Sequence, residues 1–307
     1  MFESLKEYIK IKSGLAQSSQ QVRDIERGLS ERIDFLAAYM NLTWPAHLSI
    51  DPTTLALATR QVNEELGVND YSTAIHKNDL MFAFHVNRYK YELQEAVASY
   101  LRVGASTAQN LNNILEKNGL QPGSLLDFGS GYGRVARFLP HYFPNTKISV
   151  SEVKEQAVSF QREAFGLNGI AHSQDADAFP SEKYDAILAL SVFTHLPEAA
   201  WQKWMERLLQ CLNPGGALVF TFLNQTAEAS QNILRQLENK AESFIYIERS
   251  EDQHFSFVQD SIMDDQVYGS SFVTHDYLRH QLEPQCREIH FLERQLVKGQ
   301  DALIALK

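Results

Sequence analysis

"LLDFGSGYGR", residues 125–134, is the stretch that decides the fold of the chain. An apolar run ends in the carboxylate of Asp127 and is followed by glycines at alternate positions, Gly129, Gly131 and Gly133. Glycine permits a tight turn and close approach of the backbone to a ligand, and a helix that starts here presents unpaired N–H groups to an anion. The stretch predicts a ligand-binding loop between a first strand and a helix that starts at about Gly133.

Strand-like and helix-like segments alternate after this loop. Further strands are predicted at "KISVSEV" (147–153), "GIAHS" (169–173), "YDAILAL" (184–190) and "ALVFTF" (217–222). One intervening helix ends at Gly166, and another carries Trp201, Trp204, Leu208 and Leu212. "REIHFLE" (287–293) and "DALIALK" (301–307) indicate a terminal antiparallel hairpin. The order predicts an α/β layer fold with a mainly parallel sheet.

The first hundred residues read as helical instead. A 3.6-residue period runs through Val22, Ile25, Leu29, Ile33, Leu36 and Met40. "NLTWPAHLSIDP" (41–52) breaks it, and helical patterning returns near Leu55 and over about 80–101. Ser106 and Gln109 are spaced as a capping box, and Asn118 with Gly119 is a stop signal. We therefore expect a helical N-terminal region over 1–104 and a second domain over 105–307.

Charge and composition exclude several classes of function. The 28 basic and 38 acidic residues leave a net charge of −10, which argues against broad binding to nucleic acid or to an anionic membrane. No apolar stretch approaches the roughly 18 residues that span a bilayer, and the N-terminus has no secretory signal pattern. With only Cys211 and Cys286, no cysteine cluster for a metal is expected, and we predict a cytoplasmic protein.

Two ligand classes compete for the glycine loop. A dinucleotide fingerprint requires G-x-G-x-x-G, but the sixth position counted from Gly129 is Arg134. The pattern is G-x-G-x-G, preceded by Asp127. A buried acid at that place would repel a pyrophosphate, whereas it suits a ligand that carries an ammonium group and a sulfonium.

With these motifs, residues 106–307 resemble the class I S-adenosylmethionine-dependent methyltransferases. The resemblance implies a Rossmann-like, doubly wound, mainly parallel seven-stranded sheet with a terminal antiparallel hairpin, joined to the helical N-terminal region. It also implies S-adenosylmethionine as the cofactor. The residues expected to bind it are Asp127, Gly129, Ser130, Gly131, Gly133, Arg134, Glu152, Val153, Asp175, Ala176, Leu190 and Ser191.

The resemblance gives several of these residues a role. Asp127 would support the cofactor ammonium, and Glu152, nineteen residues after Gly133, would accept hydrogen bonds from the ribose hydroxyls. Asp175 would read the adenine amino group, with Asp177 as the alternative. Arg134 would pair with the cofactor carboxylate or an anionic acceptor, or lie solvated on a helix.

Methyl transfer from a sulfonium needs chiefly alignment of the acceptor and exclusion of water. If the acceptor is a hydroxyl, a base helps to remove its proton, and His195 in "SVFTHLPE" is the candidate because it follows the fourth strand. The alternative is a histidine that only packs beside the cofactor. Asp185 is expected to be a structural residue at the start of a strand. Surface or satisfied positions are expected for His85, His172, His254, His275, His280 and His290.

The acceptor is predicted from what the fourth strand lacks. Family members that methylate amino groups of adenine or glutamine carry an Asn-Pro-Pro-aromatic motif where this chain reads "LALSVF". A small-molecule acceptor is therefore expected, methylated at oxygen, such as a sugar or another metabolite. The N-terminal region would cover the acceptor or form a homodimer. A non-catalytic cofactor-binding scaffold or sensor and, less favoured, a nucleotide-dependent oxidoreductase are the alternatives.

Overall fold

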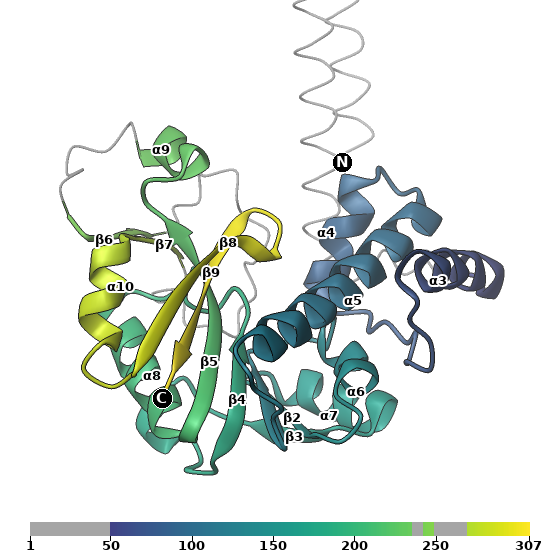
Figure 1. The fold of residues 1–307 in the computed structure, drawn as a ribbon. Coiled ribbons are helices and arrows are strands. Elements are labelled where there is room, and N and C mark those ends of the chain that lie inside the picture. The colour runs from purple at the N-terminus through teal and green to yellow at the C-terminus, as the bar shows by residue number, and fades with distance from the viewer. Residues whose placement is uncertain (1–49, 235–241, 249–268) are drawn as a thin grey trace, which may run out of the picture.

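A computed structural model describes residues 50–234, 242–248 and 269–307 of the chain (Figure 1). The predicted helical stripe from Val22 to Met40 lies outside these residues. Within the described ranges, no helix is both long enough and apolar enough to span a membrane.

The described helices and strands follow the predicted alternation. The α-helices are α3 (Pro52–Leu66), α4 (Leu80–Arg88), α5 (Leu93–Lys117), α6 (Leu139–Tyr142), α7 (Glu155–Phe165), α8 (Glu198–Gln210), α9 (Glu228–Leu234) and α10 (His275–Leu282). Short 3-10 helices span Ala136–Phe138 and Ala176–Ala178. The strands are β1 (Ser124–Phe128), β2 (Lys147–Glu152), β3 (Asn168–Ala171), β4 (Tyr184–Ala189), β5 (Leu212–Asn224), β6 (Phe244–Glu248), β7 (Gly269–Val273), β8 (Glu288–Val297) and β9 (Gln300–Leu306).

The sheet confirms the predicted mainly parallel, doubly wound architecture. Strands β3, β2, β1, β4 and β5 are parallel neighbours in that order, and β9 then pairs antiparallel with β5 and β8 with β9. These seven strands match the expected number and include the terminal hairpin. Strands β6 and β7 were not predicted. They join because β5 is 13 residues long, so that its last residues, Leu223 and Asn224, extend to pair with β7.

Helices cover both faces of the sheet (Figure 1). Successive residues of a strand point to opposite faces, so Leu125 belongs to the apolar cluster that includes Leu101 of α5, while Leu126 belongs to the one that includes Trp201 of α8. The two apolar layers bury both faces of the parallel strands, as such sheets require. One face therefore belongs to the N-terminal helices and the other to α8 and α10.

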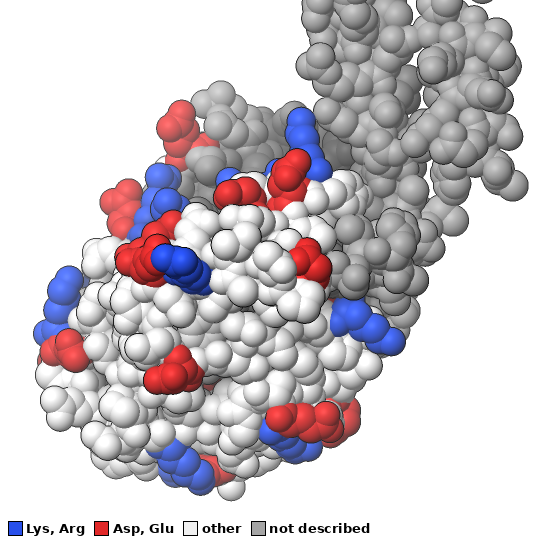
Figure 2. All heavy atoms as spheres, turned by 90° about the vertical axis from the view of Figure 1, so that its right-hand side faces the viewer, with Lys and Arg blue, Asp and Glu red and all other residues white. Residues whose placement is uncertain are grey.

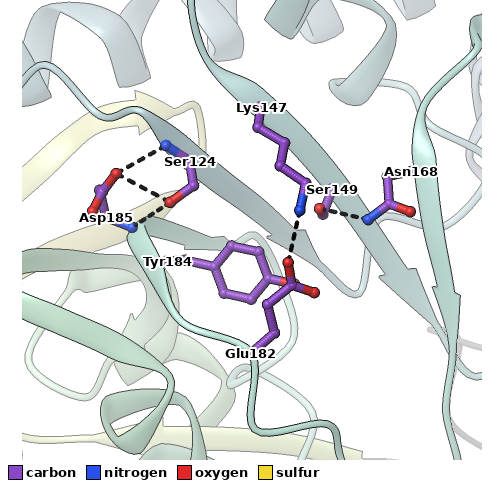
Figure 3. Close-up of polar contacts among 7 residues, drawn as sticks. All are labelled: Ser124, Lys147, Ser149, Asn168, Glu182, Tyr184 and Asp185. Atoms are coloured by element: carbon purple, nitrogen blue, oxygen red, sulfur yellow. Dashed lines mark hydrogen bonds and ion pairs between the residues drawn. The ribbon is translucent and has the colours of Figure 1, made fainter.

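A polar cluster closes the amino ends of the strands (Figure 3). Asp185 of β4 accepts hydrogen bonds from the backbone N–H and the hydroxyl of Ser124 at 2.9 and 3.0 Å. Asn213 donates to the other oxygen of Asp185 at 2.8 Å. The contacts confirm the structural role expected of Asp185 and leave the opposite edge of the sheet for a ligand.

Three local predictions were wrong. Helix α5 runs unbroken through Ser106, whose hydroxyl donates to Val103 O one turn earlier instead of capping a new helix. Its end at Asn118 with Gly119 at φ 72° is as predicted. Leu212 begins β5 rather than continuing α8. A regular helix does not start at Gly133, because the chain forms turns there and Pro140 has no N–H to donate to Ala136 O, so that a helix could not continue through both residues.

Helix α5 crosses position 104 without interruption and packs directly on the glycine loop. A Cβ built on Gly104 would lie 2.0 Å from the carbonyl oxygen of Arg134 and 2.8 Å from the Phe138 ring. No side chain fits in that space. Gly104 therefore sets how closely the N-terminal helices approach the loop.

Gly104→Ala tests this contact. Alanine is the better helix former by about 1 kcal/mol, so the change would normally stabilise a helix interior. Because the new methyl group would collide with backbone, we expect the free energy of unfolding to fall by about 1–3 kcal/mol, measured by urea denaturation. The matched variant Asn113→Ala, at an exposed position of the same helix, should leave stability unchanged or raise it slightly. A Gly104→Ala protein as stable as wild type would contradict the packing described.

Candidate functional site

A cavity of about 550 Å³ opens at the carboxyl ends of β1, β2 and β4, where a doubly wound sheet binds its ligands. The structure brings almost all of the predicted site residues to its wall. Only Gly133 is outside the lining. The predicted residues that line the cavity are Asp127, Gly129, Ser130, Gly131, Arg134, Glu152, Val153, Asp175, Ala176, Leu190, Ser191 and His195.

The three glycines of the loop have φ values of 70°, 57° and 76°, but they serve two purposes. A Cβ on Gly129 would lie 2.5 Å from the Val192 side chain, and one on Gly133 would lie 2.4 Å from the Phe165 ring. A Cβ on Gly131 would meet no atom within 4 Å. Gly129 and Gly133 therefore let the loop pack, whereas Gly131 offers bare backbone to the cavity.

The end of β2 holds this loop in place. The carbonyl oxygen of Ser151 accepts hydrogen bonds from the N–H groups of Gly129 and Ser130 at 2.9 and 3.0 Å. Glu152 accepts from the N–H groups of Gly131 and Val153 at 2.9 and 2.8 Å, one on each carboxylate oxygen. Because each carboxylate oxygen can accept a further hydrogen bond, Glu152 can also serve a ligand.

Asp127 and Arg134 bring opposite charges to the same cavity. Among the described residues, neither the Asp127 carboxylate nor the Arg134 guanidinium makes a hydrogen bond or an ion pair. Burial, and then the charge of Glu152, raises the pKa of Asp127 to about 7, although Arg134 opposes the shift. Burial lowers the pKa of Arg134, against the attraction of Tyr100, Asp79 and Asp127. Charges that are wholly or partly removed from water without partners are costly, so buried Asp127 and half-buried Arg134 together indicate a ligand that carries both signs.

The loop after β3 supplies a further acid. Asp175 lines the cavity, and its Oδ1 accepts from the N–H of Asp177 at 3.1 Å. Asp177, the alternative considered from the sequence, is not among the residues that line the cavity. Of the two carboxylates, the one within reach of a ligand in this cavity is therefore Asp175.

The segment after β4 presents His195. Ser191 adopts a left-handed φ of 60°, and its N–H donates to the Thr221 hydroxyl at 2.7 Å. Nδ1 of His195 lies 2.8 Å from the carbonyl oxygen of Gly269. A carbonyl can only accept, so Nδ1 carries the hydrogen, and the lone pair of the neutral ring is on Nε2. This is the arrangement that a histidine base requires.

Sequence reasoning missed several residues that line the cavity, among them Asp79, Met81, Tyr132, His172 and Trp204. His172 was expected to be an ordinary surface or satisfied histidine, but its ring stacks on Phe128 with centroids 5.3 Å apart. Asp79 stands directly before the apolar run "LMFAF" and can be recognised as a helix N-cap. Nothing local in the sequence shows that Asp79, which is bonded to Tyr100 of α5, lies at the same cavity as the glycine loop.

Asp127→Asn tests the electrostatics of the site through the pH dependence of stability. The raised pKa means that the folded protein holds the Asp127 proton more tightly than the unfolded chain does. The contribution of Asp127 to the free energy of unfolding therefore falls by about 4 kcal/mol as the pH rises from 4 to 7. The asparagine variant, which is neutral throughout, should match wild type near pH 4, be more stable already at pH 5, and exceed wild type most at pH 8 in urea denaturation.

A control isolates the effect of burial. Asp177→Asn changes an exposed carboxylate in the same way and should alter stability by less than about 0.5 kcal/mol at either pH. A stability difference between Asp127→Asn and wild type that stays constant from pH 5 to pH 8 would contradict the raised pKa.

Comparisons with known proteins agree with this geometry. Residues 96–266 match the profile of a family described as "Methyltransferase domain". No curated protein matches the sequence.

Three solved structures illustrate the structural likeness. An O-methyltransferase family protein from Burkholderia thailandensis has 10% identity, a TM-score of 0.47 and coverage of 72% of this chain and 62% of its own. Human N-acetylserotonin methyltransferase in complex with SAM has 19% identity, a TM-score of 0.47, and coverage of 83% of this chain and 66% of its own. A putative O-methyltransferase from Nostoc punctiforme PCC 73102 has 12% identity, a TM-score of 0.49, and coverage of 97% of this chain and 88% of its own. The chain spans less than two thirds of the first two proteins.

Such low identities transfer no substrate to this chain, whereas the family profile covers more than half of its length. The matched region starts in α5 and includes the glycine loop, the acidic ends of β1 and β2 and the whole of β4 and β5. The chain therefore belongs to the family of class I S-adenosylmethionine-dependent methyltransferases.

Proposed function

We propose that the protein transfers a methyl group from S-adenosylmethionine to oxygen of a small-molecule acceptor, such as a sugar or another metabolite. The observation that carries the proposal is the pair of opposite charges, Asp127 and Arg134, which have no hydrogen-bond or ion-pair partner among the described residues and lie in the same cavity as the bare backbone of Gly131. An amino-acid group is the chemical feature that needs an acid, a guanidinium and close approach of backbone together.

The cavity residues fit the rest of this cofactor in type. Asp127 would hold the ammonium and Arg134 the carboxylate. Glu152, with Val153 beside it, would accept from the ribose hydroxyls, and Asp175 with Ala176 would take the adenine amino group. Leu190 and Ser191 would border the cofactor, and Gly129, Ser130 and Gly133 would shape the loop beneath it.

When bound, the cofactor supplies a methyl group already activated on a sulfonium. The protein then has to align the acceptor, exclude water and accept one proton from a hydroxyl. The proposed base is Nε2 of His195. The hydrogen bond between its Nδ1 and Gly269 O supports the role, because it fixes both the tautomer and the direction of the ring.

The acceptor is proposed to be small rather than a nucleic acid. The net charge is −10. On the face drawn in Figure 2, the described Lys and Arg residues are scattered among Asp and Glu residues rather than joined in one basic area. A nucleic-acid site is built from such an area, because affinity comes largely from phosphate contacts.

The setting and assembly of the protein are also proposals. The two cysteines are buried and unpaired, which suits a reducing cytoplasm. A homodimer formed through the N-terminal region, and a location away from membranes, complete the picture. Analytical ultracentrifugation of the full chain would measure the assembly directly.

Calorimetric titration separates the proposed function from an oxidoreductase. S-adenosylhomocysteine, which keeps the amino-acid, ribose and adenine groups, should bind to the full chain, and NADH should not. The physical reason is that Asp127 favours an ammonium and repels a pyrophosphate. Binding of NADH without binding of S-adenosylhomocysteine would overturn the proposal.

His195→Gln tests catalysis once a metabolite screen with methyl-labelled cofactor has identified the acceptor. Loss of a general base should lower kcat by about 10²–10⁴-fold, with little change in affinity for S-adenosylhomocysteine. His280→Gln, at an exposed position of α10, is the matched control and should keep full activity. Transfer by His195→Gln at the wild-type rate would exclude the base role. Cofactor binding with no transfer to any acceptor would favour the scaffold alternative.

A further inference from the structure

Asp79, from the N-terminal region, lies at the cavity with its carboxylate held on three sides. It is 3% exposed and lines the cavity. One oxygen accepts from the N–H groups of Met81 and Phe82 at 2.9 and 3.1 Å, and the other accepts from the Tyr100 hydroxyl at 2.5 Å. The second oxygen has only this one partner in the described part of the chain and can accept another hydrogen bond.

Tyr100 and Arg137 connect Asp79 to the glycine loop. Tyr100 also accepts a hydrogen bond from Arg137 at 3.2 Å. The buried guanidinium of Arg137 donates to Gly133 O at 3.1 Å and to the carbonyl oxygens of Ser72 and Ala74 at 3.2 and 2.8 Å. The Arg137 side chain thus joins backbone carbonyl groups of the segment before α4 to one of the glycine loop. Asp79 therefore has a fixed position relative to the loop.

A second contact fastens the same segment. His76 stacks on Tyr132 of the glycine loop, with centroids 4.6 Å apart and ring planes within 9°. Asn78 and Tyr132 both donate to the side-chain oxygen of Gln156, at 2.9 and 3.2 Å. The residues that precede Asp79 are therefore fixed on the glycine loop, and from this part of the chain Asp79 and Met81 line the cavity.

Asp79 lines the same cavity as Asp127 and Arg134. Arg134 is attracted by both Asp79 and Asp127, and its guanidinium has no hydrogen-bond partner within the described ranges. Two acids and one base in one cavity suit a ligand group with one carboxylate and one ammonium, because an ammonium carries three donors. A single acid would leave part of that donor capacity unused.

We infer that Asp79 is a cofactor-binding residue, which takes the ammonium of S-adenosylmethionine together with Asp127. The inference rests on the proposed function and adds a residue from outside the glycine-loop domain. It assigns the N-terminal region a part in holding the cofactor, in addition to any contact with the acceptor. Tyr100 and Arg137 act through Asp79 as positioning residues.

Calorimetry with two ligands tests the inference on the full chain. S-adenosylhomocysteine carries the amino-acid group, and 5′-methylthioadenosine keeps the adenosine and the thioether but lacks that group. Asp79→Asn retains an oxygen for the Met81 and Phe82 N–H groups and removes the charge. We expect its affinity for S-adenosylhomocysteine to fall at least about tenfold, as for one charge-assisted hydrogen bond, with affinity for 5′-methylthioadenosine unchanged.

Two further variants complete the experiment. Asp51→Asn changes the N-cap of α3, which does not line the cavity, and should bind both ligands as wild type does. Tyr100→Phe keeps the α4 cap but removes the hydrogen bond to the second oxygen of Asp79. It should lower the affinity for S-adenosylhomocysteine by a smaller factor than Asp79→Asn does and leave the affinity for 5′-methylthioadenosine unchanged.

The outcomes separate the inference from the function on which it rests. Wild-type affinity of Asp79→Asn for S-adenosylhomocysteine would overturn the inference. An equal loss of affinity for both ligands in Asp79→Asn would also overturn the inference, since Asp79 would then have only a structural role. If wild type bound neither ligand, the proposed function itself would fail.

Discussion

The hydrogen bonds between the end of β2 and the glycine loop are the contacts on which the site depends. Ser151 O and the Glu152 carboxylate together receive the N–H groups of Gly129, Ser130 and Gly131. They hold consecutive residues in a turn that only glycine adopts readily at these φ values. One strand end therefore both shapes the loop and supplies an acid to the cavity.

The packing of the loop explains how the ligand end of the cavity stays open. Gly129 and Gly133 are pressed against Val192 and Phe165, which leaves Gly131 as the point of bare backbone. On the other side, α5 lies against the loop at Gly104. Hydrogen bonds from Arg137 join the loop to the carbonyl oxygens of Ser72 and Ala74. The N-terminal helices and the sheet thus build one site, and α5 runs unbroken through the domain boundary predicted at residue 104.

Much of the fold and 12 of the 25 residues that line the cavity could be predicted from the sequence, because they follow from local chemistry. β1 lies directly before the glycine loop as predicted, and Gly166 and Asn118 end helices as expected. The errors arise where distant packing overrides a local signal. Ser106 has the spacing of a cap, but the burial of one face of α5 keeps the helix continuous. His172 carries no motif and Asp79 carries only the signal of a helix N-cap, and only tertiary packing brings the two residues to the cavity.

A crystal structure of the full chain with S-adenosylhomocysteine tests the central claim most directly. The account predicts the amino-acid group over Gly131, with its ammonium within about 3.2 Å of a carboxylate oxygen of Asp127 and its carboxylate on Arg134. The ribose should then lie at Glu152 and the adenine at Asp175. A ligand bound with its adenine over Gly131, or bound outside this cavity, would contradict the account.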